Sequence, residues 1–456
     1  MPLVTLIAEI QDLTGYRVTS VTDTNQDHPL RTMEDCMQAV PVHRGAMLLV
    51  LSLLHVVPGR TVDASDPIHL LSTTGSTRAT RYASANKIVS IGDKTHVAWL
   101  DSVSRTMIAT YDHATDQWSD AVHVGDGVDN HGGPALTCDS RGFLHIVFGP
   151  HAREPFQHYQ SASANDAAEW VRRETFGDHA TYPSLVCDPA DTLHIVYRGG
   201  PKPDHPFALL YQRLPAGGEW SEPAVLARCP DEWDGYTHYH HCLTIDSQGA
   251  MHVAFNFFYD GRALEVGYLK STSEGRTWLR ADGESAALPV STGSGAIILQ
   301  SQQPLNVINI ACDERDTPWI GVNEQNQFTL RRYEGGEWRA SGLNQFLEFD
   351  HTSRSLNWGA FTIGAGGRLR VPVISGRKAD GGGDVWLLTS DPAKQHFRQT
   401  RMAAADTQHP HTGATLERFT GHNRVETPWL LFSTGDRGSD TFGIGIHHRV
   451  SVRNVE

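Results

Sequence analysis

Four side chains that could carry acid–base chemistry lie in the stretch Asp129–Arg198. They are His131, His151, Tyr182 and Arg198. Histidine exchanges protons near neutral pH, and tyrosine does so when a neighbouring cation lowers its pKa. Arginine neutralises a carboxylate through two parallel hydrogen bonds. Proton abstraction beside a carboxylate needs a base, an acid and a fixed cation, so this set of residues indicates that kind of chemistry.

The same stretch contains one sequence pattern twice. Residues 134–148 read PALTCDSRGFLHIVF, and residues 183–197 read PSLVCDPADTLHIVY. Each copy has an apolar run, a Cys-Asp pair, a turn, and then Leu-His-Ile-Val followed by an aromatic residue. Two apolar runs separated by a short turn predict a β-hairpin. The repeat therefore predicts the scaffold on which the four candidate residues are placed.

The second strand of this hairpin can be aligned seven times along the chain. The copies are HVAWL (96–100), HIVFG (145–149), HIVYR (194–198), HVAFN (252–256), WIGVN (319–323), RVPVI (370–374) and WLLFS (429–433). Repeats of about 50 residues with several short strands are typical of a β-propeller. We therefore expect an all-β fold, with a single seven-bladed β-propeller at 76–456 and a short N-terminal extension at 1–75. One apolar residue of each copy should be buried: Val97, Ile146, Ile195, Val253, Ile320, Val371 and Leu430.

The repeat also separates structural residues from candidate site residues. Four histidines occupy one position of the repeat and are expected to be structural: His96, His145, His194 and His252. Three cysteines share a position that holds Ile in another copy, which predicts buried free thiols: Cys138, Cys187 and Cys312. Tyr197 shares its position with other aromatic residues and should pack in a blade. Arg213 lies toward the opposite end of its blade and is left out of the site.

The hairpin geometry predicts which residues meet. Every hairpin turn lies at one end of its blade, so the start of the first strand and the end of the second lie together at the other end. The candidate catalytic residues all occupy such positions in the second and third blades: His131, His151, Tyr182 and Arg198. In the fourth blade the candidate substrate-binding residues are Tyr239 and His240 at the strand start, Asn256 at the strand end, and Arg262 nearby. The residues at strand starts and ends should face one rim of the central channel, where propellers usually bind ligands.

Several local motifs resemble those of the BNR-repeat propeller lyases, the ulvan lyase and rhamnosyl-glucuronate lyase families. They are AsnHisGlyGlyPro at 130–134, GlyProHis at 149–151, ThrTyrPro at 181–183 and TyrArgGlyGly at 197–200. The segment SerThrSerGluGlyArgThrTrp at 271–278 also resembles an Asp-box turn, with Glu274 in place of Asp. The resemblance implies a lyase that cleaves a uronate-containing glycan by β-elimination, with catalytic roles for His131, His151, Tyr182 and Arg198. Such lyases often carry a further Arg where this chain has Asn256, which leaves the exact substrate open.

Two other functions stay open on the sequence. A sialidase-like glycoside hydrolase would need an arginine triad and either a Tyr–Glu pair or paired carboxylates. A non-catalytic sugar-binding propeller would need no titratable set at all. The net charge of −14 disfavours a nucleic-acid partner. We expect an anionic polysaccharide as partner, no membrane association and a monomeric protein. No cofactor is expected to be required, and a structural metal ion stays an open alternative without an assignable ligand set.

The extension contains one apolar run, MLLVLSLLHVV at 47–57. It is too short to span a bilayer as a helix. It resembles the apolar core of an export signal if translation begins at Met33, and otherwise predicts a packed strand or helix. The first interpretation favours a secreted or periplasmic protein.

Overall fold

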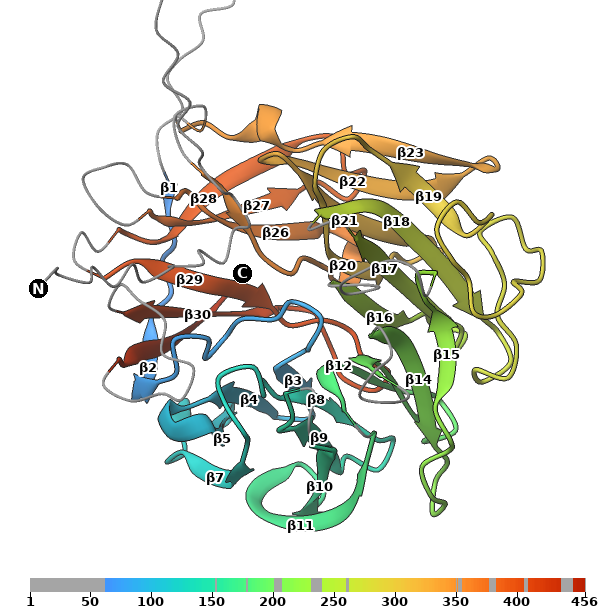
Figure 1. The fold of residues 1–456 in the computed structure, drawn as a ribbon. Helices are drawn as coiled ribbons and strands as arrows, with labels where there is room; N and C mark the ends of the chain where they lie inside the picture. Colours follow the sequence, from blue (N-terminus) through green and yellow to red (C-terminus); the bar gives the residue numbers. More distant parts are fainter. Residues whose placement is uncertain are drawn as a thin grey trace, which may run out of the picture. The chain divides into compact units, whose positions relative to one another are not determined.

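A computed structural model describes residues 62–455, apart from 152–153, 178, 201–206, 231–239, 260–261, 350, 352–354, 377–382, 406–408 and 436–445. These residues belong to one compact unit, Thr61–Glu456. Its strands form seven sheets, which are the blades of a β-propeller (Figure 1). No helix among the described residues is long and apolar enough to cross a membrane. The apolar run at 47–57 lies outside the described residues.

The first four blades follow one another along the chain, each with its first strand innermost. The first contains β3 (Ile88–Ile91), β4 (Lys94–Leu100), η1 (Ser102–Ser104), β5 (Arg105–Asp112), β6 (Gln117–Trp118) and β7 (Val122–Asp126). The second contains β8 (Ala135–Cys138), β9 (Leu144–Phe148), β10 (Phe156–Ser163) and β11 (Asp166–Phe176). The third contains β12 (Thr181–Cys187), β13 (Leu193–Gly199), β14 (Ala208–Leu214) and β15 (Ala224–Ala227). The fourth contains β16 (His241–Ile245), β17 (Met251–Tyr259), β18 (Arg262–Ser271) and β19 (Ile297–Gln300).

The last three blades follow the same order, and the sixth and seventh each have an outer strand from residues 62–75. The fifth contains β20 (Leu305–Cys312), β21 (Pro318–Glu324), β22 (Gln327–Glu334) and β23 (Glu337–Gly342), followed by η2 (Asn344–Phe346). The sixth contains β24 (Asn357–Trp358), β25 (Thr362–Ile363), η3 (Ala365–Gly367), β26 (Leu369–Ile374), β27 (Val385–Ser390), β28 (Phe397–Ala403) and β1 (Val62–Asp63). The seventh contains β29 (His411–Leu416), β30 (Trp429–Gly435), β31 (His448–Asn454) and β2 (His69–Gly75).

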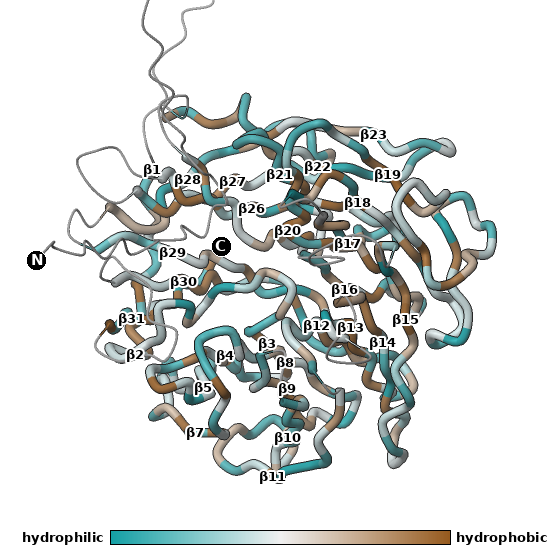
Figure 2. The backbone as a smooth tube through the Cα atoms, in the orientation of Figure 1, coloured by the Kyte–Doolittle hydropathy of each residue, from teal (hydrophilic) through white to brown (hydrophobic). Residues whose placement is uncertain are grey.

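The predicted seven-bladed repeat is confirmed. The seven aligned motifs are the second strands of the seven blades: β4, β9, β13, β17, β21, β26 and β30. All seven expected core residues are fully buried. Apolar segments run along inner strands such as β16 and β17, whereas outer strands such as β11 and β23 are more hydrophilic (Figure 2). The predicted free thiols are observed as well, although Cys312 is only partly buried.

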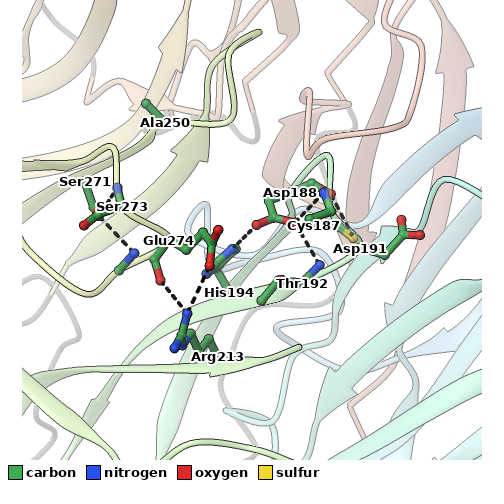
Figure 3. A network of polar contacts seen from close by, with 12 residues as sticks. Cys187, Asp188, Asp191, Thr192, His194, Arg213, Ala250, Ser271, Ser273 and Glu274 are labelled. Atoms are coloured by element: carbon green, nitrogen blue, oxygen red, sulfur yellow. Dashed lines mark hydrogen bonds and ion pairs between the residues drawn. The ribbon is translucent and has the colours of Figure 1, made fainter. Parts of the chain in front are cut away.

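The Asp of the repeat explains why the hairpins fold alike. Asp188 Oδ1 accepts hydrogen bonds from the backbone N–H groups of Ala190 and Thr192, which close the turn. Its Oδ2 lies 3.0 Å from His194 Nε2, and His194 Nδ1 lies 2.8 Å from the Tyr211 hydroxyl (Figure 3 shows the Asp188–His194 contact). The fourth blade repeats the arrangement with Asp246, His252 and Tyr268. The histidine position of the repeat is therefore structural, as predicted.

Arg213 also belongs to the framework. Its guanidinium donates to the backbone oxygen and the carboxylate of Glu274, both at 3.3 Å (Figure 3). Glu274 lies in the Asp-box-like turn, where Ser271 Oγ accepts from the backbone N–H of Gly275 at 2.9 Å. The contact joins the third blade to the fourth, away from the candidate catalytic residues.

Two strands from the segment assigned to the extension take part in the propeller. β2 pairs with β31 at the outer edge of the seventh blade, and β1 runs parallel to β28 in the sixth. N- and C-terminal strands therefore complete one sheet. The sequence repeat does not include them because each contributes one outer strand, without the hairpin motif.

The seventh blade differs from the others in its first hairpin, where a long segment, 417–428, replaces the tight turn. Arg418 Nη2 donates to the Ser84 carbonyl at 2.9 Å in the first blade. The Thr420 carbonyl accepts from Cys187 N–H at 2.8 Å in the third blade. This segment therefore crosses between blades and supports the residues around Ser84, which precede β3.

Candidate active site

A histidine pair lies on the rim of the second blade, held by one carboxylate. His131 precedes β8, and His151 follows β9. Asp129 Oδ1 lies 2.9 Å from His131 Nδ1, and Asp129 Oδ2 lies 2.7 Å from His151 Nδ1. The two imidazole rings stack with centroids 3.7 Å apart and planes 18° apart. The structure therefore brings together two histidines that are twenty residues apart in sequence.

Glycines in both motifs allow this close approach. A Cβ atom at Gly132 would lie 2.9 Å from the Gly149 carbonyl oxygen, which is closer than real side chains come. Gly149 has φ of 118°, in the region that disfavours other residues. The AsnHisGlyGlyPro and GlyProHis motifs thus specify the packing of two loops that carry the histidines.

The hydrogen bonds between Asp129 and the two histidines affect the ionisation of Asp129 and of His131. Burial alone would raise the pKa of Asp129, but hydrogen bonds from His131 and His151 outweigh it and hold that pKa well below its usual range. Burial lowers the pKa of His131, the hydrogen bond to Asp129 opposes this, and the nearby Arg78 lowers it further. Asp129 is therefore a carboxylate at neutral pH, with two imidazoles as its donors.

Tyr182 is placed by an irregularity in β12. Its φ is 60°, and the register with β13 shifts between Thr181 and Ser184. Bulges of this kind redirect a side chain and are common beside active sites. The Tyr182 ring lies with its centroid 6.4 Å from the His131 ring. The bulge therefore directs the tyrosine toward the histidine pair, although the residue is 6% exposed.

Arg198 lies behind Tyr182 on β13. Its side chain is 2% exposed, and its Cζ lies 4.6 Å from the centroid of the Tyr182 ring and 4.7 Å from that of Phe207. Cation–π contacts of this kind hold a guanidinium plane in a fixed orientation. His131, His151, Tyr182 and Arg198 thus form a chain of contacts from ring to ring and from ring to guanidinium, with the buried Arg198 at one end.

Three residues of this cluster were not singled out from the sequence: Asp129, Arg78 and Tyr82. Tyr82, with φ of 69°, packs against Tyr182 with ring centroids 4.8 Å apart and planes tilted by 33°. Arg78 donates to the Tyr82 hydroxyl at 2.6 Å. Tyr82 precedes the first strand of the first blade, as His131 precedes that of the second. The hairpin rule that found His131 would therefore have included Tyr82 had it been applied to the first blade.

A cavity of about 230 Å³ adjoins the two tyrosines. It is lined by residues from the strands nearest the channel and the loops before them, including Tyr82, Tyr182, His240, Ile308 and Trp358. Burial, and then the charge of Arg198, lower the pKa of His240 to about 4. His240 is therefore a neutral polar group in this cavity at neutral pH, which agrees with a place in substrate contact but not with a cationic role.

The other candidate substrate-binding residues have different positions. Tyr239 lies outside the described residues. Asn256 is fully buried, and both ends of its amide bind backbone: Nδ2 donates to the Glu265 carbonyl at 3.0 Å and Oδ1 accepts from Val307 N–H at 2.7 Å. Asn256 thus joins the fourth blade to the fifth and belongs to the framework. Arg262 is exposed at the first position of β18 and does not line the cavity.

Two groups of three side chains within the described ranges bring metal-ligating atoms within 4.8 Å of one another: Asp129, His131 and His151, and Cys187, Asp191 and His422. In the first group the carboxylate already accepts from both imidazoles. In the second, the Asp191 carboxylate binds Ser140 through N–H at 2.7 Å and Oγ at 2.8 Å. Asp316 and Ser247 repeat that contact between later blades, which favours a structural role for Asp191.

Comparison with known proteins agrees with this architecture. A model of the BNR repeat-containing family matches residues 94–346, which is more than half of the chain. The chain belongs to the BNR repeat-containing family. The matched residues span β4 to η2 and include the whole cluster described above except Arg78 and Tyr82.

Two curated sequences and one solved structure are similar to this chain. The chain is 26% identical to an ulvan lyase of Nonlabens ulvanivorans over 155 residues, which are 28% of this chain and 32% of that one. It is 23% identical to an ulvan lyase of Alteromonas sp. (strain LOR) over 236 residues, which are 43% and 48%. The chain thus spans a third to a half of the length of these relatives. The structure of a PL25 ulvan lyase bound to -[GlcA(1-4)Rha3S]- superposes with a TM-score of 0.67 at 16% identity, covering 83% of this chain and 94% of that one. That likeness shows the shared propeller fold.

Proposed function

We propose that this BNR-repeat protein is a polysaccharide lyase that cleaves a uronate-containing glycan by β-elimination. The observation that carries the proposal is the contact cluster of two histidines, a tyrosine and an arginine, of which the tyrosine lines a cavity. Three of these groups can transfer or stabilise a proton, and the fourth is a permanent cation. The names of the curated relatives and of the superposed structure support the same reaction class.

The reaction breaks two bonds and forms one double bond. A base removes the C5 proton of the uronate, the electron pair forms the C4–C5 double bond, and the C4–O bond to the next sugar breaks as an acid protonates the leaving oxygen. An ionised carboxylate beside C5 makes that proton very weakly acidic, so a cation must stabilise the enolate-like transition state. Arg198 suits this role because its charge is permanent and its plane is fixed between two rings.

Tyr182 and the histidine pair are assigned to proton transfer. Arg198 Cζ lies 4.6 Å from the centroid of the Tyr182 ring, so the negative charge left on the tyrosine after proton loss has a cation nearby. His131 and His151 bind Asp129 through Nδ1, which leaves Nε2 of each ring for the substrate. We assign base or acid to Tyr182, and the uronate contact or the second proton transfer to the histidines.

A sialidase-like hydrolase fits the site less well. Hydrolysis would need two carboxylates flanking the glycosidic bond, or a nucleophile pair. Among the described residues of the contact cluster the only carboxylate is Asp129, and both of its oxygens are engaged by imidazoles.

The test is incubation of the full chain with a polymer of glucuronate and rhamnose 3-sulfate, the ligand of the superposed structure, and with other uronate glycans. A lyase generates reducing ends together with the ultraviolet absorbance of an unsaturated uronate. Reducing ends without that absorbance would indicate a hydrolase. Binding without either product would indicate a sugar-binding propeller.

A further inference from the structure

The carboxylate of Asp129 receives three hydrogen bonds from the histidine pair. Its Oδ1 accepts from the backbone N–H of His131 at 2.7 Å and lies 2.9 Å from His131 Nδ1. Its Oδ2 lies 2.7 Å from His151 Nδ1. The Asp129 side chain is 7% exposed, whereas those of His131 and His151 are 13% and 32% exposed. The carboxylate therefore lies beneath the two rings, on the side away from solvent.

This arrangement decides where each imidazole carries its hydrogen. An ionised carboxylate accepts hydrogen bonds and donates none. Both Nδ1 atoms must therefore carry hydrogen, and Nε2 of each ring is the atom that can accept or release a further proton. Because the rings are almost parallel and share one anchor, the two Nε2 atoms face away from the same carboxylate.

We propose that Asp129 is the positioning residue of this site: it holds His131 and His151 as Nδ1–H tautomers, stacked, with both Nε2 atoms presented to the substrate. The effect of Asp129 on catalysis rests on the proposed function, whereas the tautomers of His131 and His151 do not depend on it. A carboxylate that fixes an imidazole in this manner stabilises the correct tautomer and orientation without reacting itself.

The blade cores provide the contrast that makes Asp129 specific. Asp188 and Asp246 also bind imidazoles, but through Nε2, and the Nδ1 of each of those rings binds a tyrosine hydroxyl. Both nitrogens of a core histidine are thus used within the blade. Among the described residues, Asp129 is the only carboxylate that binds two imidazole rings through Nδ1, which leaves Nε2 of His131 and of His151 facing outward.

The first measurement is the tautomer state of the wild-type protein. Side-chain ¹⁵N spectra of the histidine-labelled full chain distinguish Nδ1–H from Nε2–H rings, and His131→Ala and His151→Ala spectra assign the two signals. We expect Nδ1–H for both. An Nε2–H ring at either position overturns the proposal whatever the activity, so this arm stands even if the protein is not a lyase.

The second measurement is the Asp129→Asn variant, in which an amide replaces the carboxylate without changing its shape. An amide can donate to one Nδ1, so we expect at least one ring to change tautomer, and kcat for unsaturated product to fall by about 10²- to 10⁴-fold with a smaller change in KM. Asp129→Glu keeps the carboxylate and should recover part of kcat. Retention of kcat within about threefold, or a loss without any tautomer change, overturns the proposal.

Asp246→Asn is the matched control. It removes the same kind of Asp–His contact from a blade core, so it should lower the melting temperature and leave kcat and the rim tautomers unchanged.

A chelation experiment tests whether Asp129, His131 and His151 bind a metal ion instead. If Zn²⁺ restores wild-type activity after chelation and shifts the ¹⁵N signals of both His131 and His151, Asp129 holds a metal with the histidines, and the positioning role is overturned. Absence of unsaturated product from the wild type would instead refute the proposed function alone.

Discussion

The histidines of the blade cores and those of the rim share a partner, a buried aspartate, and differ in everything else. His194 and His252 have side chains at most 1% exposed, and both nitrogens of each bind within the blade. His131 and His151 use one nitrogen for Asp129 and keep 13% and 32% of their side-chain surface exposed. The same pair of residue types therefore stabilises the fold in one place and, in the proposed reaction, positions groups for proton transfer in the other.

What separates the two regions is the place in the hairpin. The core pairs lie where strand and turn meet, and a side chain there is enclosed by neighbouring strands. The rim pair lies in loops, where backbone irregularity decides the direction of a side chain. This comparison predicts that rim substitutions change the rate with little effect on stability, and that core substitutions do the reverse.

The largest effect is expected from Tyr182→Phe. The change removes the hydroxyl assigned to proton transfer and keeps the ring that packs against Tyr82 and Arg198. We expect kcat to fall by about 10³-fold or more, with KM and melting temperature nearly unchanged. The measurement is the rate of unsaturated-product formation beside a melting curve. Retention of most activity would remove Tyr182 from the mechanism and leave His131 or His151 as the base.

Arg198 should have the next largest effect. Arg198→Ala removes the cation assigned to the uronate, and the rate should fall by about 10²- to 10³-fold. Arg198→Lys should recover only part of it, because an ammonium lacks the planar pair of donors. Arg213→Ala is the control, since that guanidinium binds the Glu274 turn. Equal activity losses in Arg213→Ala and Arg198→Ala would contradict a specific role of Arg198 in binding the uronate.

His194→Ala tests the other half of the comparison. The change leaves Asp188 Oδ2 and the Tyr211 hydroxyl without their buried partner. Stability should fall by about 2–4 kcal/mol, while the folded protein keeps its kcat. Urea unfolding and steady-state rates measure the two quantities. A large drop in kcat with unchanged stability would indicate that His194 takes part in the reaction and would contradict the distinction between core and rim histidines.

The smallest effect is expected for the pH dependence of stability that Glu417 causes. Glu417 is a buried carboxyl group whose donors are Ser90 and Asn423 rather than imidazoles, so it contrasts with Asp129. Burial raises the pKa of Glu417 from 4.5 to about 7, although Ser90 and Asn423 donate to it. The folded state then binds more protons than the unfolded state between those values. Stability should therefore fall as pH rises from about 4.5 to about 7, by about 1–3 kcal/mol at most. Urea midpoints across this range should be flatter for Glu417→Gln, and an equally steep wild-type and variant profile would contradict the assignment.

The sequence by itself determined the scaffold and predicted four residues that the structure brings into one chain of contacts. Seven copies of one strand predict seven blades, because each copy must bury the same apolar positions. Comparison between copies separated His194, which recurs, from His131, which does not. The hairpin geometry placed His131, His151, Tyr182 and Arg198 on one rim because strand starts and ends are fixed by the turns between them.

Only the tertiary structure decided how the rim side chains face one another. Asp129 is two residues from His131, yet its bond to His151 depends on the packing of two loops against Gly149. Asn256 occupies a rim position by sequence, but its amide is drawn into backbone contacts with the next blade. The positions of a repeat follow from local strand periodicity, whereas side-chain direction in a loop depends on φ, bulges and neighbouring blades, which are non-local and differ from blade to blade.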